Sequence, residues 1–206
     1  MLPRIRTEPD PAAFFRDGDD LFSLKGVMLH AHSLLEAQLY LKMTGCEKCN
    51  PEPAAIRASK EATVQSGATN IVQVRGRCPV CGADQAMDFA MENPDALPAS
   101  GPSPAINLTE KRSQIIDIGQ WLTLAHLFVQ ESRTETNRER ARSLNLQSAQ
   151  CLDEALKFYD EPDNDLPPSD AFYCDSSRRR FRDFPQQFSR SRLINERRKL
   201  PVTFPI

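Results

Sequence analysis

The chain has 206 residues, of which 40% are hydrophobic and 26% are charged, as in ordinary globular proteins of one domain or two small ones. The first eleven residues hold two acids and three prolines, which excludes the apolar core of a secretion signal there. The most apolar run, residues 115–129, contains Asp117, Gln120 and His126 and is shorter than the roughly 20 residues that cross a bilayer. We therefore expect a cytoplasmic protein without a membrane segment.

The net charge of −2 is unevenly distributed. Nine Lys and Arg residues and three acids lie between Asp175 and Lys199, so this stretch carries a local charge of +6. The rest of the chain is correspondingly acidic. Such asymmetry predicts a basic C-terminal tail with an acidic partner, which can be the body of the protein itself.

The first half of the chain predicts a small β module. Residues 1–26 are rich in proline and aspartate and predict an irregular N-terminal arm. Residues 34–45 alternate between apolar and more polar positions, which predicts a half-buried strand that leads into Cys46. Residues 50–70 are interpreted as an insertion with a short helical turn around 53–62. Two further strands are predicted at 71–78 and 86–91, so the module spans residues 27–92.

The second half predicts helices. Residues 93–108 form a Pro-rich linker, where we place a domain boundary. Thr109 is the predicted cap of a helix whose apolar residues recur every three or four positions, and a second helix is predicted from about Asn137 to Tyr159. These helices are expected to form an antiparallel hairpin over residues 109–160. Prolines end it, and residues 161–206 form the basic tail.

The cysteines are the most specific feature of the sequence. Two Cys-x-x-Cys pairs, Cys46 with Cys49 and Cys78 with Cys81, offer the four sulfur ligands that tetrahedral zinc prefers. Gly82 follows the second pair and Asn50 the first, and both residue types tolerate the positive φ of a tight turn. The sequence therefore predicts one structural Zn²⁺ per chain, held by Cys46, Cys49, Cys78 and Cys81.

The motif CPVCG after a predicted strand resembles the knuckle of zinc-ribbon proteins, and GCEKCN resembles a less standard first knuckle. The resemblance covers residues 39–91. It implies a metal that clamps two β-turns and a surface that docks nucleic acid or protein. A redox pair, two disulfides and an iron site are the alternatives. Cys151 and Cys174 are interpreted as small packing residues.

Other chemistry is weakly indicated. His30 and His32 lie on one side of an extended segment and are candidates for a second metal site, as in a metalloenzyme. No residue is assigned a catalytic role: the sequence lacks a phosphate-binding glycine loop and an activated serine signature, and zinc held by four cysteines leaves no open position.

The tail between 176 and 201 interleaves arginines with Phe181, Phe184 and Phe188. Arginines bind phosphate and exposed aromatic rings stack on bases, so a nucleic-acid arm is one interpretation; packing of the rings on the hairpin is the other. The candidate phosphate-binding residues are Arg178, Arg179, Arg180, Arg190, Arg192, Arg197 and Arg198.

Together these features predict an α+β protein, with an antiparallel zinc ribbon followed by a helical hairpin and a basic helical tail. The predicted function is that of a non-catalytic interaction module in which zinc fixes the ribbon and the hairpin or tail contacts a protein partner. A nucleic-acid-binding zinc-ribbon protein is the first alternative, and a metalloenzyme that uses His30 and His32 is the second.

Overall fold

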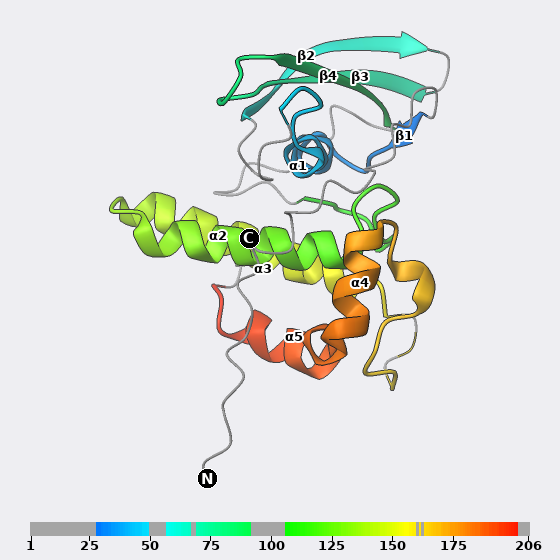
Figure 1. Cartoon of the computed structure of the whole chain (residues 1–206), viewed down its shortest axis with the longest axis vertical. Helices are drawn as coiled ribbons and strands as arrows, with labels where there is room; N and C mark the ends of the chain where they lie inside the picture. The colour runs from blue at the N-terminus through cyan, green and yellow to red at the C-terminus, as the bar shows by residue number, and fades with distance from the viewer. Residues whose placement is uncertain are drawn as a thin grey trace.

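The computed structural model describes residues 28–49, 69–91, 106–159, 161 and 163–201, together with the backbone of 57–66. The described chain is a mixed α/β structure in layers (Figure 1). A small sheet lies at one end, a single helix lies against it, a pair of long helices follows, and two short C-terminal helices lie on the far side of that pair. The predicted N-terminal arm and most of the predicted linker lie outside the described residues.

The sheet has the strand order β1-β4-β3-β2. Strands β2 (Arg57–Ser66), β3 (Thr69–Arg77) and β4 (Asp84–Met91) are antiparallel, and the two-residue β1 (Leu29–His30) pairs in parallel with β4. The predicted strands at 71–78 and 86–91 are confirmed. The helical turn predicted around 53–62 is wrong from residue 57 onward, because β2 pairs with β3 along its whole length.

The predicted strand at 34–45 is also wrong, because these residues form helix α1 (Leu34–Thr44). Ser33 caps the helix: its Oγ accepts a hydrogen bond of 3.0 Å from the amide of Glu36, and the Glu36 carboxylate accepts one of 2.5 Å from the amide of His32. The helix lies between the sheet and the long helices (Figure 1), and each of its residues is buried or half-buried. Burial on both sides removes the polar face that gives an amphipathic helix its recognisable period.

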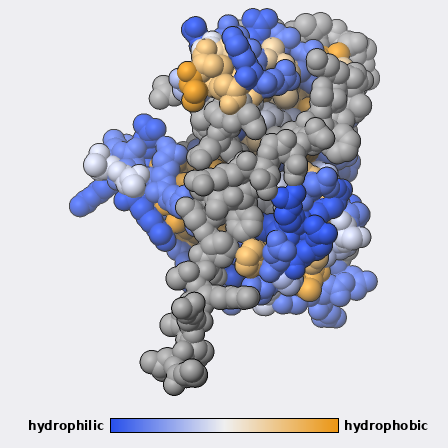
Figure 2. Space-filling view, in the orientation of Figure 1, coloured by the Kyte–Doolittle hydropathy of each residue, from blue (hydrophilic) through white to orange (hydrophobic). Residues whose placement is uncertain are grey.

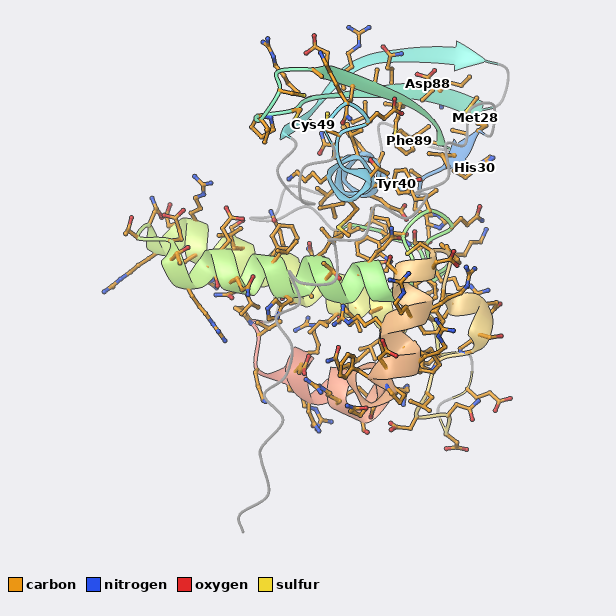
Figure 3. All side chains as sticks on the ribbon, in the orientation of Figure 1. Met28, His30, Tyr40, Cys49, Asp88 and Phe89 are labelled. Carbon is orange, nitrogen blue, oxygen red and sulfur yellow. The ribbon has the colours of Figure 1, made fainter. Side chains whose placement is uncertain are left out.

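Helix α1 packs on the apolar face of the sheet. Tyr40 and Phe89 meet edge to face, with ring centroids 6.0 Å apart, and both are labelled in Figure 3. Phe89 is fully buried, as is Val72, its neighbour across the β3–β4 register. Aromatic pairs of this geometry contribute about 1 kcal/mol beyond the area that they bury.

The predicted helical hairpin is confirmed as α2 (Ile118–Thr134) and α3 (Arg138–Leu156). Helix α3 begins where it was predicted, and Asn137 caps it, with its Oδ1 accepting bonds from two backbone amides. The cap predicted at Thr109 is wrong: α2 begins after Asp117, whose carboxylate accepts from the amide of Gln120, while the Gln120 side chain accepts from the amide of Asp117. This reciprocal capping box fixes the start of the helix.

The C-terminal helices α4 (Asp175–Asp183) and α5 (Arg190–Arg198) pack against the hairpin. Helix α4 approaches α2 closely where α2 carries Gly119, since a Cβ at this position would lie 2.7 Å from Cβ of Ser177. The rings of Phe172, Phe181 and Phe188 form a cluster with centroid distances of 4.7 to 5.4 Å. One hydrophobic core therefore runs from the sheet side through the hairpin to α5.

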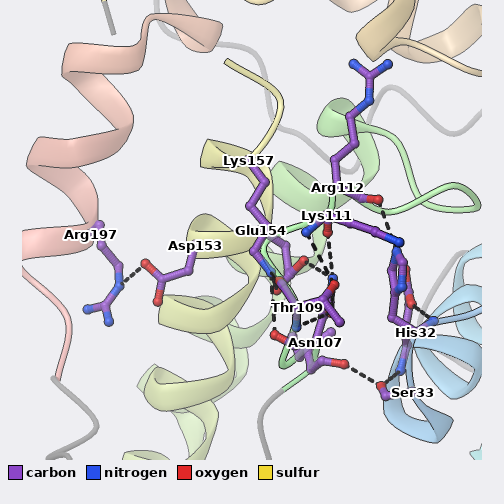
Figure 4. Close-up of polar contacts among 12 residues, drawn as sticks. His32, Ser33, Asn107, Thr109, Lys111, Arg112, Asp153, Glu154, Lys157 and Arg197 are labelled. Carbon is purple, nitrogen blue, oxygen red and sulfur yellow. Dashed lines mark hydrogen bonds and ion pairs between the residues drawn. The ribbon is translucent and has the colours of Figure 1, made fainter. Parts of the chain in front are cut away.

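A buried polar network joins α1 to the hairpin (Figure 4). Ser33 Oγ donates to the carbonyl of Ile106, and Nε2 of His32 lies 3.1 Å from the carbonyl oxygen of Arg112. Asn107 donates to Oε2 of Glu154 at 3.3 Å. The first two bonds join the start of α1 to residues 106–112, and the third joins this segment to α3. The network therefore connects the two halves of the chain.

Glu154 gives this network a pH dependence. Burial raises the pKa of its carboxyl to about 7, although bonds from Lys157 and Asn107 act in the opposite direction. The folded state binds the proton of Glu154 more tightly than the unfolded state does, because the pKa is higher in the folded state. The free energy of unfolding therefore falls as pH rises from about 4.5 to 7 and Glu154 becomes charged.

We therefore expect Glu154→Gln to gain stability relative to the natural chain as pH rises from 5 to 8, by on the order of 3 kcal/mol, since one pKa unit corresponds to about 1.4 kcal/mol. Urea unfolding at both pH values measures this difference. Glu139→Gln, which changes an exposed carboxylate of the same helix, is the control. Equal pH dependence of the two variants would contradict the assignment.

Candidate metal centre

The sulfur atoms of the two Cys-x-x-Cys pairs meet at one end of the sheet. Sγ of Cys46 lies 3.6 Å from Sγ of Cys81, and Sγ of Cys49 lies 3.6 Å from Sγ of Cys78. All four sulfurs lie within 4.8 Å of one another. A tetrahedron with Zn–S bonds of about 2.3 Å has S–S edges of about 3.8 Å, so these four atoms have the separation that a tetrahedral metal requires.

The two pairs are positioned by different local structures. Gly45, with φ of 72°, ends α1 and turns the chain into Cys46. Cys78 follows β3, and its turn is closed by two backbone bonds of 2.9 Å, from Cys78 N to Ala83 O and from Gly82 N to Cys78 O. Gly82 has a φ of 70°, which confirms the expectation for this residue. Asn50 lies outside the described residues.

The first pair departs from the expected ribbon. Cys46 and Cys49 follow helix α1, whereas both pairs were expected to follow strands. Only the second pair lies in the turn of a β-hairpin. The four cysteines therefore lie between the C-terminal end of α1 and the β3–β4 turn, where a bound metal would connect the helix to the sheet.

Backbone amides favour a thiolate in the second turn. The amides of Cys81 and Val80 donate to Cys78 and lower the pKa of its thiol to about 7. The thiol of Cys49 has its pKa raised to about 12, first by its hydrogen bond with Cys81 and also by those with Cys78 and Cys46. The thiol of Cys78 is thus prepared for ligation, whereas that of Cys49 must release its proton when a cation binds.

The centre is half-buried. Cys46 and Cys78 are 2% and 1% exposed, whereas Cys49 is exposed and Cys81 is intermediate. Val80 at the tip of the second turn is 72% exposed. Figure 2 shows apolar residues at the surface of the sheet end of the molecule. Four protein sulfurs fill a tetrahedron and leave no position for a substrate, which is compatible with a structural metal.

The two histidines expected to form a second site have different surroundings. His30 lies in β1, at the opposite end of the sheet from Cys49 (Figure 3), while His32 precedes α1 and contacts the Arg112 carbonyl. Among the described residues, the four cysteines are the group of metal-binding side chains that comes together, and neither histidine belongs to it.

The arginines of the C-terminal segment have several different surroundings. Arg197 forms an ion pair of 2.7 Å with Asp153 of α3 (Figure 4), in line with an acidic body as the partner of the tail. Arg178 and Arg192 pair with Asp175 and Glu196 of their own helices. Arg198 is exposed, and Arg179 and Arg190 are partly buried. Arg180 faces a cavity described below.

The remaining cysteines lie away from the metal centre. Cys151 lies in α3 and is completely buried in the hydrophobic core, and burial raises the pKa of its thiol. Cys174 precedes α4 and donates to Oδ2 of Asp117 at 3.3 Å. Asp117 is a structurally important residue that the sequence interpretation missed, although the D-x-x-Q capping signal was present.

No family model, curated protein or solved structure matches the chain. Among the helices that the structure describes, none combines the length and apolar character needed to cross a bilayer. The function must therefore be argued from the geometry of this chain alone.

Proposed function

We propose that the protein is a non-catalytic interaction module in which one Zn²⁺, held by Cys46, Cys49, Cys78 and Cys81, fixes α1 to the sheet. The observation that carries the proposal is the separation of the four sulfurs, which fits a closed tetrahedral site. Zinc is favoured over other metals because it has no geometric demand of its own and is commonly bound by four thiolates in structural sites.

The helical hairpin or the basic C-terminal segment is the proposed contact for a protein partner. Support comes from the rings of Phe181 and Phe188, which pack on Phe172 and are thereby engaged within the protein. Rings held in this way do not form a platform on which bases stack. The ion pair between Arg197 and Asp153 likewise anchors α5 to the hairpin.

Binding of nucleic acid by the basic segment is the second candidate. The observation in its favour is that Arg178, Arg182 and Arg198 are exposed on the two short helices. Phosphate contacts release counterions, so such binding would weaken steeply as salt concentration rises.

A capture experiment separates the two candidates. The tagged chain is incubated with extract of its native cells, either untreated or nuclease-treated, at 50 and 300 mM salt (about a sixfold range, chosen from the expected salt slope). We expect a stoichiometric protein partner that is retained at both concentrations. The double variant Arg178→Gln with Arg198→Gln tests the tail. A second double variant, Arg138→Gln with Arg142→Gln, makes the same change of charge at exposed positions of α3. Loss of all binding after nuclease treatment would favour nucleic acid.

A further inference from the structure

A cavity of about 390 Å³ lies between the helical hairpin and the two C-terminal helices. Its size falls within the range of about 300–1,000 Å³ that is usual for small-molecule sites. Aliphatic side chains from α2, α3, α5 and the residues after α5 form much of its wall: Leu122, Ala125, Val129, Leu152, Leu193 and Leu200. Such a wall suits an alkyl chain, because apolar surface removed from water contributes favourably to binding.

Four of the eight polar residues that line the cavity are Lys or Arg. Arg133, Arg180, Arg192 and Lys199 line it, and Glu196 is the single acid among its lining residues. Glu196 is already paired with Arg192 at 2.8 Å. The cavity therefore has an excess of positive charge beside an apolar wall, and it complements a ligand that is apolar at one end and anionic at the other.

Arg180 is the best-positioned cation. Its Nε donates to Oε1 of Gln187 at 2.9 Å, and its Nη1 donates to Oγ1 of Thr123 at 3.2 Å. The guanidinium carbon lies 5.5 Å from the centroid of the Phe188 ring. These contacts with uncharged groups hold the guanidinium in one place.

The charge of Arg180 is costly where it lies. Burial lowers the pKa of its guanidinium, and the neighbouring Arg192 lowers it further, while Asp117 and Glu196 offset only part of this. An anion bound beside the two arginines would offset both effects. The cavity thus contains a fixed, partly desolvated cation, which favours a carboxylate more strongly than a cation in open water does.

We propose that this cavity binds an amphipathic organic acid, with the alkyl chain against the leucines and Val129 and the carboxylate at Arg180. The inference is independent of the metal centre, which lies at the other end of the layered structure (Figures 1 and 3). It adds a small-molecule site to a protein whose proposed function is interaction with another protein.

Three ligands of equal chain length test the proposal by isothermal titration calorimetry: decanoate, 1-decanol and decyltrimethylammonium, each kept below its aggregation concentration. We expect saturable binding of one decanoate per chain, at least about 10-fold weaker binding of the alcohol, and no binding of the cation. Equal affinity for all three ligands would show nonspecific adsorption to apolar surface and would overturn the proposal.

Two variants locate the site. Arg180→Gln should weaken decanoate at least about 10-fold, whereas Arg198→Gln, an equal charge change at an exposed position of α5, should leave the affinity unchanged. Val129→Trp fills the cavity without removing a charge and should abolish binding. Thermal unfolding verifies that both cavity variants are folded. Undiminished binding by folded Val129→Trp would exclude this cavity, as would equal losses in Arg180→Gln and Arg198→Gln.

Discussion

Replacement of Cys78 by serine should remove the metal and unfold the sheet end of the protein. Cys78 is 1% exposed and its sulfur lies 3.6 Å from that of Cys49, so a hydroxyl here interrupts the set of ligands at its buried side. Structural zinc contributes on the order of 10 kcal/mol to small modules, while whole domains are stable by only about 5–15 kcal/mol. The metal content, measured by elemental analysis, should fall from one Zn²⁺ per chain to none.

The structural consequence should be local to the sheet and α1. Amide hydrogen exchange should lose its protection in β3, β4 and α1 of the Cys78→Ser variant, and a chelator should have the same effect on the natural chain. Cys174→Ser is the matched control, since this cysteine lies outside the cluster and a hydroxyl can still donate to Asp117. The metal proposal fails if the freshly purified, reduced natural chain contains no metal and still protects these amides.

The parts of the fold that follow from local sequence were predictable. The four cysteines of the two Cys-x-x-Cys pairs have a spacing that predicts a metal site, and the structure brings their sulfurs together. Helix α3 and the strands β3 and β4 carry the periods of a helix and of strands, and Asn137 marks the start of α3. In these elements the local pattern and the tertiary environment agree.

Helix α1 shows why the remaining elements were harder to predict. Ala37, Leu39, Leu41 and Met43 alternate like strand residues, but the helix is covered on both sides, so its apolar positions are not confined to one stripe. The capping signal Ser33-x-x-Glu36 was available in the sequence and carried the correct answer. A cap is therefore the more reliable signal where an element is buried all round.

The cavity and the buried polar network depend on contacts between distant segments. Arg180 is one of several arginines in a basic run, and its sequence position does not distinguish it from Arg178 or Arg179. Only the packing of α4 on α2 places its guanidinium beside Thr123, 57 residues earlier in the chain. The same holds for Asp117, which acts as a helix cap and also as a tertiary anchor.

Replacement of Asp117 by alanine should destabilise the helical half by about 3–5 kcal/mol, because it leaves several buried donors unsatisfied at about 1–3 kcal/mol each. The carboxylate is completely buried and accepts bonds of 2.8 Å from the Gln120 amide and from Ser177 Oγ. Its second oxygen accepts from the amides of Tyr173 and Cys174, at 3.0 and 3.1 Å. Alanine leaves these donors without their acceptor and also removes the negative charge that stabilises the start of α2.

The cap of α3 provides the comparison that separates the two roles of Asp117. Asn137 also accepts from two amides, but in a solvent-exposed position where water can replace it, so Asn137→Ala should cost only about 1 kcal/mol. Urea unfolding, followed through the buried Trp121, measures both variants.

Asp117→Asn retains the size of the side chain, yet it must turn an NH₂ group toward one pair of donors, so it should recover only part of the loss. If Asp117→Ala costs no more than Asn137→Ala, the carboxylate is a helix cap alone, and α4, with Arg180, is held to the hairpin by its apolar contacts.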